Sequence, residues 1–306
     1  IDAMSKVDLK KKVTNWFKQF KSPFVAITFV LILFVVVTYV YVLLWAVISS
    51  FKSQLQFGAN MFGLPSRWRL DNYVKVFKNL SVGIELSDGN TRYAGFFELL
   101  WNSLLFAGLH AVIMVVSRGA VAYVACKYKY KFSNVLYSIV ILVMIVPVIN
   151  SLASSLNWNK TLGVYDNFPM ILYTAIGFAD SGFLIFFGVF QGIDDTYKEA
   201  AEIDGAGHLR IMISIMFPLA KIPLLIMGVQ YFIGQWNNYM TPYLYMPSMP
   251  TLSVALFLFN QTRVGEMANE IAQMTAAVLV AIPCVVLFLA FRDKMVGNLT
   301  MGGIKG

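Results

Sequence analysis

The apolar stretch FVAITFVLILFVVVTYVYVLLWAVI, Phe24–Ile48, decides the class of this protein. It carries no charged side chain and exceeds the roughly 20 apolar residues that a helix needs to cross a bilayer. It is also too long for the apolar core of a signal peptide, and no convincing small-residue cleavage site follows it. We therefore expect a membrane-spanning helix that stays in the protein as an anchor.

Five further apolar segments follow the first along the chain. They lie near residues 96–125, 135–156, 168–190, 222–240 and 271–291, the last with a bend expected at Pro283. Charged residues make up only 13% of the chain, whereas soluble domains average about 25%. The sequence therefore predicts an all-α membrane protein with six transmembrane helices.

Lysines and arginines predict which parts of the chain face the cytoplasm. With the N-terminus inside, fifteen of them fall on that side: Lys6, Lys10, Lys11, Lys12, Lys18, Lys21, Lys127, Lys129, Lys131, Lys198, Arg210, Lys221, Arg292, Lys294 and Lys305. The two short outer loops hold only Lys160 and Arg263. The long outer loop 49–95 holds six, but long loops count little in the positive-inside rule. Both termini are therefore expected inside, and the net charge of +8 is assigned to topology rather than to nucleic-acid binding.

This topology divides the chain into three parts. We expect a basic cytoplasmic segment 1–22, a transmembrane domain 23–292 with a cytoplasmic loop 191–221, and a cytoplasmic tail 293–306. Within the first part, Val7–Lys21 has the pattern of a basic amphipathic helix on the membrane surface. A solvated positive-inside signal explains the same residues equally well.

A compact polar stretch, EAAEIDGAG (Glu199–Gly207), interrupts the apolar segments. Thr196 is expected to be the N-cap of a short helix, with Glu199 completing a capping box. Gly205 is expected to end that helix at positive φ. A second helix should start at His208, and Pro218 should stop or kink it. The expected product is a helical knuckle whose small residues allow close approach of another protein.

The knuckle resembles the EAA loop of ABC-importer permeases. The residues that match the pattern are Glu199, Ala200, Ala201, Asp204, Gly205, Ala206 and Pro218, and Gly207 stands where Ser is common. The resemblance implies that this loop is a coupling helix that docks into a cleft of an ATP-hydrolysing subunit. Asp194 stands where many relatives carry Pro, and Asp194 or Asp195 is able to cap the helix instead.

Three other stretches resemble the carbohydrate-importer permeases, in particular the second, smaller permease of maltose-type systems. They are LPSRWRLDNYVKVF (Leu64–Phe77), FIGQWNNYMTPYLY (Phe232–Tyr245) and RDKMVGNLTMGGIKG (Arg292–Gly306). The resemblance implies import of a carbohydrate through a multi-pass protein of the cell membrane. It also implies as partners a second permease, two ATP-binding cassette subunits and an extracytoplasmic solute-binding protein.

Polar residues on the fifth segment are candidates for a sugar pathway, because amides bond to hydroxyls and aromatic rings stack on sugar faces. These candidates are Gln230, Trp236, Asn237, Asn238 and Tyr239. Trp and Tyr also form ordinary interfacial belts, which is the competing explanation. In the long outer loop, Lys52, Arg67 and Arg69 would suit an acidic glycan or a contact with the binding protein.

Three ionisable residues lie within apolar segments, where such residues mark functional sites by default. Asp180 is a candidate for the pathway or a gate, or is satisfied by Ser181 or a helix terminus. His110 is expected to hydrogen-bond between helices, and Arg118 to extend toward the inner interface.

The sequence contains no GxxxxGK[ST] phosphate loop, no GxSxG and no HExxH. We therefore expect neither catalytic nor metal-binding residues, with ATP and Mg²⁺ bound by the partner ATPase. Two other functions remain open: a proton-coupled secondary transporter that uses Asp180 and His110, and a membrane-anchored assembly protein. Neither of them requires the knuckle.

Overall fold

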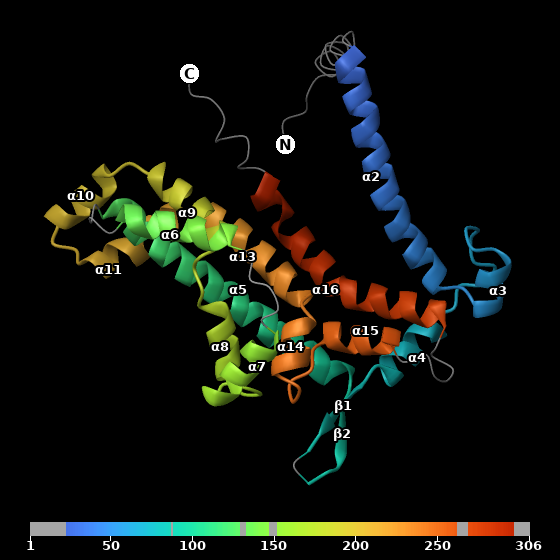
Figure 1. Cartoon of the computed structure of the whole chain (residues 1–306). Helices are drawn as coiled ribbons and strands as arrows, with labels where there is room; N and C mark the ends of the chain where they lie inside the picture. Colours follow the sequence, from blue (N-terminus) through green and yellow to red (C-terminus); the bar gives the residue numbers. More distant parts are fainter. Residues whose placement is uncertain (1–22, 87, 129–132, 147–151, 262–268, 297–306) are drawn as a thin grey trace.

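The computed structural model describes residues 23–86, 88–128, 133–146, 152–261 and 269–296, and most of these are helical (Figure 1). The expected amphipathic segment Val7–Lys21 and the last ten residues of the expected tail lie outside the described residues.

Three of the described helices are long and apolar enough to cross a membrane. They are α2 (Pro23–Ser50), α5 (Phe96–Lys127) and α16 (Glu270–Val296), and they coincide with the first, second and sixth expected spans. A fourth crossing is counted if His208–Leu219 and α13 (Lys221–Trp236), which meet at 82°, form one bent span.

The third and fourth expected spans differ from single long helices. The third corresponds to α6 (Ser133–Ile145) and α7 (Leu152–Thr161), with residues 147–151 outside the description. The fourth was predicted wrongly as one helix, because α8 (Pro169–Ala175) and α9 (Ser181–Gln191) are separate. The Asp180 carboxylate accepts hydrogen bonds from the backbone N–H groups of Gly182 and Phe183, so a new helix begins there.

The segment between α2 and α5 contains α3 (Gln54–Ala59), α4 (Asp71–Asn79) and an antiparallel hairpin of β1 (Val82–Glu85) and β2 (Thr91–Ala94). The all-α prediction misses this hairpin. Its sequence signal was the Asp88-Gly89 pair, a common hairpin turn, and Gly89 has φ +81°. Two short helices, α14 (Met240–Tyr245) and α15 (Leu252–Gln261), follow α13.

Helix α5 is the centre of the fold and packs mainly against α13 and α9. Around its first turns, Leu99 belongs to a buried cluster with Trp236 of α13 and Ala276 of α16. Around its last turns, Tyr123 belongs to a second cluster with Phe186 and Phe190 of α9. Helix α5 therefore connects two separate cores.

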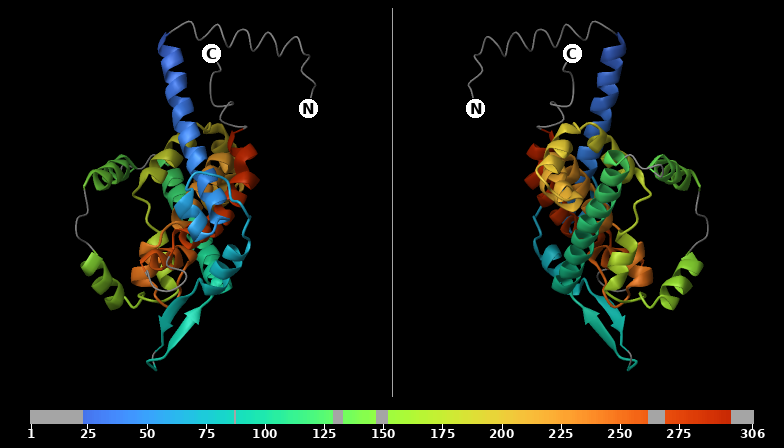
Figure 2. Two further views of the ribbon diagram at one scale, coloured as in Figure 1. Left: turned by 90° about the vertical axis from the view of Figure 1, so that its right-hand side faces the viewer. Right: turned by 90° about the vertical axis from the view of Figure 1, so that its left-hand side faces the viewer.

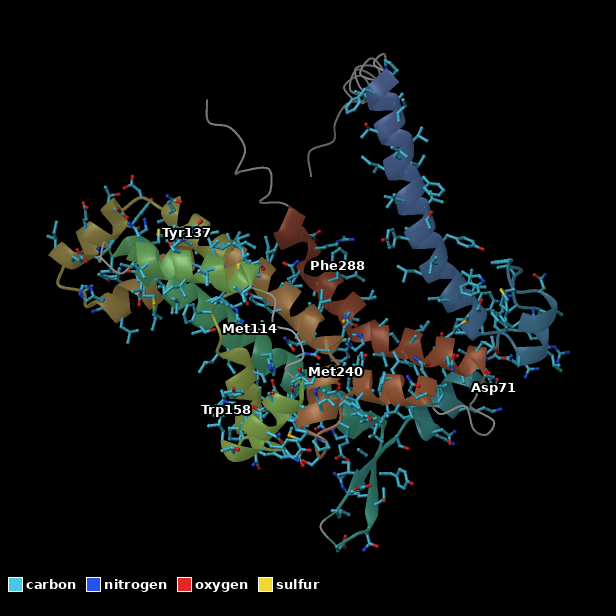
Figure 3. All side chains as sticks on the ribbon, in the orientation of Figure 1. Asp71, Met114, Tyr137, Trp158, Met240 and Phe288 are labelled. Carbon is cyan, nitrogen blue, oxygen red and sulfur yellow. The ribbon has the colours of Figure 1, made fainter. Side chains whose placement is uncertain are left out.

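Helix α2 stands apart from the other helices except near its C-terminal end, where it meets α16 (Figure 1). Its side chains project into open space along most of its length (Figure 3), as suits a helix surrounded by lipid or by another apolar protein. The start of α2, the end of α16 and the loop after α9 lie toward one side of the molecule, and the hairpin lies toward the other (Figure 2).

Candidate functional site

The knuckle begins with α10 (Thr196–Ile203), and its cap differs from the expected one. Thr196 is the first residue of α10 and not its N-cap. Asp194 takes over the capping function, because its Oδ1 accepts hydrogen bonds from the Thr196 N–H and hydroxyl, both at 2.9 Å. These two hydrogen bonds lower the pKa of the Asp194 carboxyl group. The Asp194 side chain thus stabilises the start of this helix.

The C-terminal end of α10 forms a Schellman motif, as the sequence suggested for Gly205. The Ala206 N–H bonds to the Ala201 carbonyl at 2.9 Å, and the Gly205 N–H bonds to the Glu202 carbonyl at 3.1 Å. Gly205 has φ +76°, which side-chain-bearing residues rarely adopt. Ala201 and Ala206 both belong to the core around the end of α5, so the turn is anchored to the body.

Three short pieces lead from the turn to α13. They are α11 (His208–Ile211), a π-helical turn η1 (Met212–Met216) and α12 (Phe217–Leu219). Pro218 lies near the end of this continuous helical run, and the sharp bend follows at Ala220. The sequence predicted a break in this region but not the π-helical turn.

The surface of the knuckle that points away from the core is open and partly apolar. Glu199, Ala200, Asp204 and Gly207 are exposed, whereas Ala201 is buried and Ala206 half-buried. Ile203 and Leu209 are 86% and 66% exposed, and Tyr197 and Ile213 flank them. These four exposed apolar residues were not identified from the sequence, because the pattern of apolar residues in one sequence does not tell which side of a two-helix knuckle is covered. An exposed apolar patch with a charged rim is typical of a protein-binding surface.

Asp180, which is half-buried, forms an ion pair with the buried Arg118 in the middle of the fold. Its Oδ2 accepts a hydrogen bond from Arg118 Nε at 2.7 Å, while Oδ1 caps α9. Arg118 is only 5% exposed, and it also donates to the Ala175 carbonyl at the end of α8 at 2.8 Å. The expectation that Arg118 extends to the interface is therefore wrong. Its guanidinium instead ties both halves of the broken span to α5.

Gly182 allows a neighbouring side chain of α13 to approach this ion pair. A Cβ atom at Gly182 would lie 1.6 Å from the Tyr231 hydroxyl. The Arg118 guanidinium lies over the Tyr231 ring, 5.4 Å from its centre. The cluster thus joins α5, α9 and α13 at one point.

His110 has other partners. Its Nδ1 lies 2.9 Å from the Phe106 carbonyl, and its Nε2 lies 2.8 Å from the Thr174 hydroxyl on α8. This is the interhelical hydrogen bond expected from the sequence. A proton relay would need His110 and Asp180 to exchange a proton, but each is bonded to a different group.

The pathway candidates on α13 fall on different surfaces. Gln230 and Asn237 are seven residues apart, hence on one helix face, and both are exposed, as is Gly234 between them. Trp236 is 2% exposed and donates from Nε1 to the Val280 carbonyl of α16 at 3.1 Å. Trp236 is thus a packing residue in this structure, and its burial does not favour its prediction as a sugar contact, which stays a prediction.

Asn238 and Tyr239 shape the turn that follows α13. The Asn238 side chain accepts from the Thr241 N–H at 3.1 Å and donates to the side-chain Oε1 of Gln235 at 3.0 Å. Tyr239 stacks on Phe257 of α15 with ring centres 4.3 Å apart. Gln235 in turn reaches Met114, which Figure 3 labels on the middle of α5. These contacts fix the outer end of α13 against α5 and α15.

The three candidate cations of the long loop 49–95 differ in their exposure. Lys52 is fully buried and donates to the Asn60 and Met61 carbonyls, at 3.2 and 2.9 Å. It is therefore unavailable to a glycan or a partner protein. Arg67 and Arg69 are exposed and remain candidates for such a contact.

Comparison with known proteins relates this chain to transport permeases. The family model described as "Binding-protein-dependent transport system inner membrane component" matches residues 99–299. The diacetylchitobiose uptake system permease protein NgcG of Streptomyces coelicolor is 24% identical, with 91% of this chain and 88% of that protein covered. The multiple sugar-binding transport system permease protein MsmG of Streptococcus mutans is 27% identical, with 86% and 91% covered.

A solved structure has a similar fold. It is the crystal structure of a bacterial ABC transporter involved in the import of the acidic polysaccharide alginate, and its chain superposes with a TM-score of 0.68 at 19% identity. The match covers 96% of this chain and 99% of that chain. This multi-pass membrane protein belongs to the family of binding-protein-dependent transport system inner membrane components.

Proposed function

We propose that this chain is a permease subunit of an ATP-driven, binding-protein-dependent importer that moves a carbohydrate into the cytoplasm. It works in the cell membrane with a second permease, two ATP-binding cassette subunits and an extracytoplasmic solute-binding protein. The partner ATPase binds ATP and Mg²⁺ and hydrolyses the nucleotide. This chain supplies half of the pathway and one docking site.

The exposed surface of the α10–α11 knuckle carries the proposal. A loop that merely crossed the cytoplasm would not need a capped helix, a Schellman turn anchored in the core and two outward apolar side chains, Ile203 and Leu209. Such a surface is suited to a cleft of another protein. Glu199, Ala200, Asp204, Gly205 and Gly207 would line the contact, with Ala201, Ala206 and Pro218 supporting it from behind.

The mechanism is alternating access between two conformations. Closure of the ATPase pair moves the docked α10, and the helices joined to it turn the cavity outward. A ligand shifts such an equilibrium only by its difference in affinity for the two states. The knuckle must therefore bind the open and closed ATPase pairs with different free energies.

The relatives support a proposal for the substrate class. The sugars named for NgcG and for the melibiose/raffinose/stachyose import permease protein MelC of Bacillus subtilis, 28% identical over 67% of this chain, favour an oligosaccharide. The exposed amides Gln230 and Asn237 have the hydrogen-bonding chemistry for sugar hydroxyls. They are our candidates for the pathway face of this subunit.

The topology of the proposal has six crossings. The helices α6 and α7 would make the third, and the broken pair α8 and α9 the fourth. Discontinuous helices are tolerated in membranes where neighbouring side chains satisfy the freed backbone groups. Arg118 at the Ala175 carbonyl and Asp180 at the start of α9 provide such bonds. The start of α2, the end of α16 and the knuckle lie toward the same side of the molecule. This placement supports a transmembrane domain 23–292 with cytoplasmic segments 1–22 and 293–306 at its two ends.

Purification of the affinity-tagged chain from native membranes, with identification of its partners, tests this function. We expect an ATP-hydrolysing subunit and a second permease to co-purify. A chain that purifies alone and catalyses gradient-driven transport without ATP would replace the proposal by secondary transport.

Asn237→Ala is expected to reduce sugar uptake severalfold while the chain still binds the ATPase, because a sugar hydroxyl would lose a bond of about 1 kcal/mol. The matched control is Asn79→Ala. Both amides donate to the carbonyl four residues earlier in their own helix, at 2.9 and 2.8 Å, but Asn79 ends α4 outside the membrane domain's core. Uptake and membrane abundance are measured for both. Equal uptake by the two variants would remove Asn237 from the pathway.

A further inference from the structure

The C-terminal end of α5 is hydrogen-bonded to the chain just before α10. Lys127, the last residue of α5, is 8% exposed despite its charge. Its Nζ donates to the Ile193 carbonyl and to Asp195 Oδ1, the latter at 2.6 Å. Charge-assisted hydrogen bonds of this kind are roughly twice as strong as neutral ones. The entry to the knuckle is thereby bonded to a helix more than 60 residues earlier in the chain.

A second contact holds α10 itself. Lys198 Nζ donates to the Lys127 carbonyl at 3.3 Å and lies 4.4 Å from the centre of the Tyr128 ring. The same ammonium lies 3.4 Å from Glu202 in the next turn of α10. The cation thus joins the helix to the residue that follows α5.

A third contact holds the start of α11. The Tyr128 hydroxyl lies 2.9 Å from His208 Nδ1, and the two rings meet edge to face with centres 5.1 Å apart. Tyr128 also contacts Tyr123 of α5 edge to face. The end of α5 therefore contacts the knuckle before, within and after α10.

These contacts matter because α5 is not continuous with the knuckle. Helices α9 and α13 are connected to it through the chain and must move with it. Apart from the Arg118 cluster in the middle of α5, this helix packs on them mainly through apolar side chains, and packed helices slide over one another in shear motions. Directional bonds to Asp195, Lys198 and His208 oppose such sliding.

Resting on the proposed function, we infer that Lys127 and Tyr128 form a latch with Asp195, Lys198 and His208, which makes α5 move with the docked α10. Helix α5 then transmits the displacement from the ATPase side to the outer core around Leu99. Lys127 and Tyr128 are positioning residues, since they contact neither the ATPase surface nor the pathway amides described above.

Spin-label distances in the assembled transporter test the latch. Labels are attached at Trp101→Cys on α5 and Arg210→Cys on α11, both exposed positions, in a chain with Cys126→Ala and Cys284→Ala. The distance is compared between the nucleotide-free complex and the complex trapped with ATP and vanadate. With the latch intact, we expect the same distance in both states. With Lys127→Met, we expect it to shift or broaden on trapping.

Two further variants make the result specific. Lys127→Arg keeps the charged donor and should restore the single distance. Lys221→Met removes an exposed lysine at the other end of the loop and should behave as the wild type. If Lys127→Met does not assemble, Tyr128→Phe is measured in its place, because it removes the hydroxyl that bonds to His208 and keeps the ring.

Either of two results would overturn the latch. One is a label-to-label distance in the otherwise wild-type chain that changes on trapping, and the other is a distance in the Lys127→Met chain that stays the same on trapping. Both are obtained on a complex that contains the ATPase and hydrolyses ATP. Failure of the proposed function would show earlier, as absence of the ATPase from the purified complex.

Discussion

Gly205→Val is expected to abolish most ATP-driven uptake while the chain still inserts in the membrane. Gly205 has φ +76°, and a β-branched residue is a genuine outlier at positive φ. Left-handed backbone costs an ordinary residue roughly 1–2 kcal/mol. A penalty of this size shifts a conformational equilibrium by a factor of about 5–30. The Schellman bonds at Ala201 and Glu202 would open, and α11 would leave α10 in a different direction.

The neighbouring glycine supplies the matched control. Gly207 has φ −70°, and a Cβ atom there would have open space, as it would at Gly205. Gly207→Ala should therefore keep the turn, and Gly205→Asn should keep much of it, since Asn tolerates left-handed backbone. Uptake and the amount of co-purified ATPase are measured for all three. Equal losses in Gly205→Val and Gly207→Ala would mean that surface shape, and not the turn, is what matters.

Arg118→Ala is expected to lower the stability of the membrane domain by about 3 kcal/mol, the lower end of the range for removing one partner of a buried ion pair. The lower end applies because the Asp180 side chain is 35% exposed. The variant leaves Asp180 with its capping bonds only and frees the Ala175 carbonyl. Helices α8 and α9 would lose their common attachment to α5. Thermal unfolding of the purified complex in detergent measures the loss.

An exposed ion pair on the same chain is the comparison. Arg92 and Glu98 form two 2.7 Å hydrogen bonds, but their side chains are 48% and 36% exposed. Surface pairs contribute about 0–1 kcal/mol, so Arg92→Ala should change the melting temperature little. Asp180→Asn combined with Arg118→Leu should recover part of the loss, because neither charge then remains unpaired. A melting temperature of Arg118→Ala as high as that of Arg92→Ala would contradict the role of the buried pair.

Local features of the knuckle were predictable because their causes are local. Positive φ at Gly205 follows from a glycine after the last turn of a short polar helix, and the hydrogen bonds that use it join residues at most five positions apart. The cap was predicted only in part, because Thr196 was expected as the N-cap and Asp194 or Asp195 was named as an alternative. Thr196 and Asp194 both had the chemistry, and the backbone direction after α9 selected Asp194.

The pathway face was only partly predictable for a different reason. The residues Gln230, Trp236 and Asn237 all lie near the outer end of one helix, and the sequence does not tell which of its faces meets α16. Packing turned Trp236 inward, toward the Val280 carbonyl of α16, and left the two amides exposed.

By itself, the sequence determined the membrane class, the helices α2, α5 and α16, and the turn of the knuckle. Long apolar runs and glycine geometry act within one segment, so no tertiary contact is needed to recognise them. Only the tertiary structure decided that Arg118 meets Asp180, that Lys127 meets Asp195, and that Lys52 is buried. The two pairs join residues 62 and 68 positions apart, and Lys52 is enclosed by its own loop. A charge in an apolar environment is stable only where the fold brings a partner to it, and the order of residues along the chain does not reveal that partner.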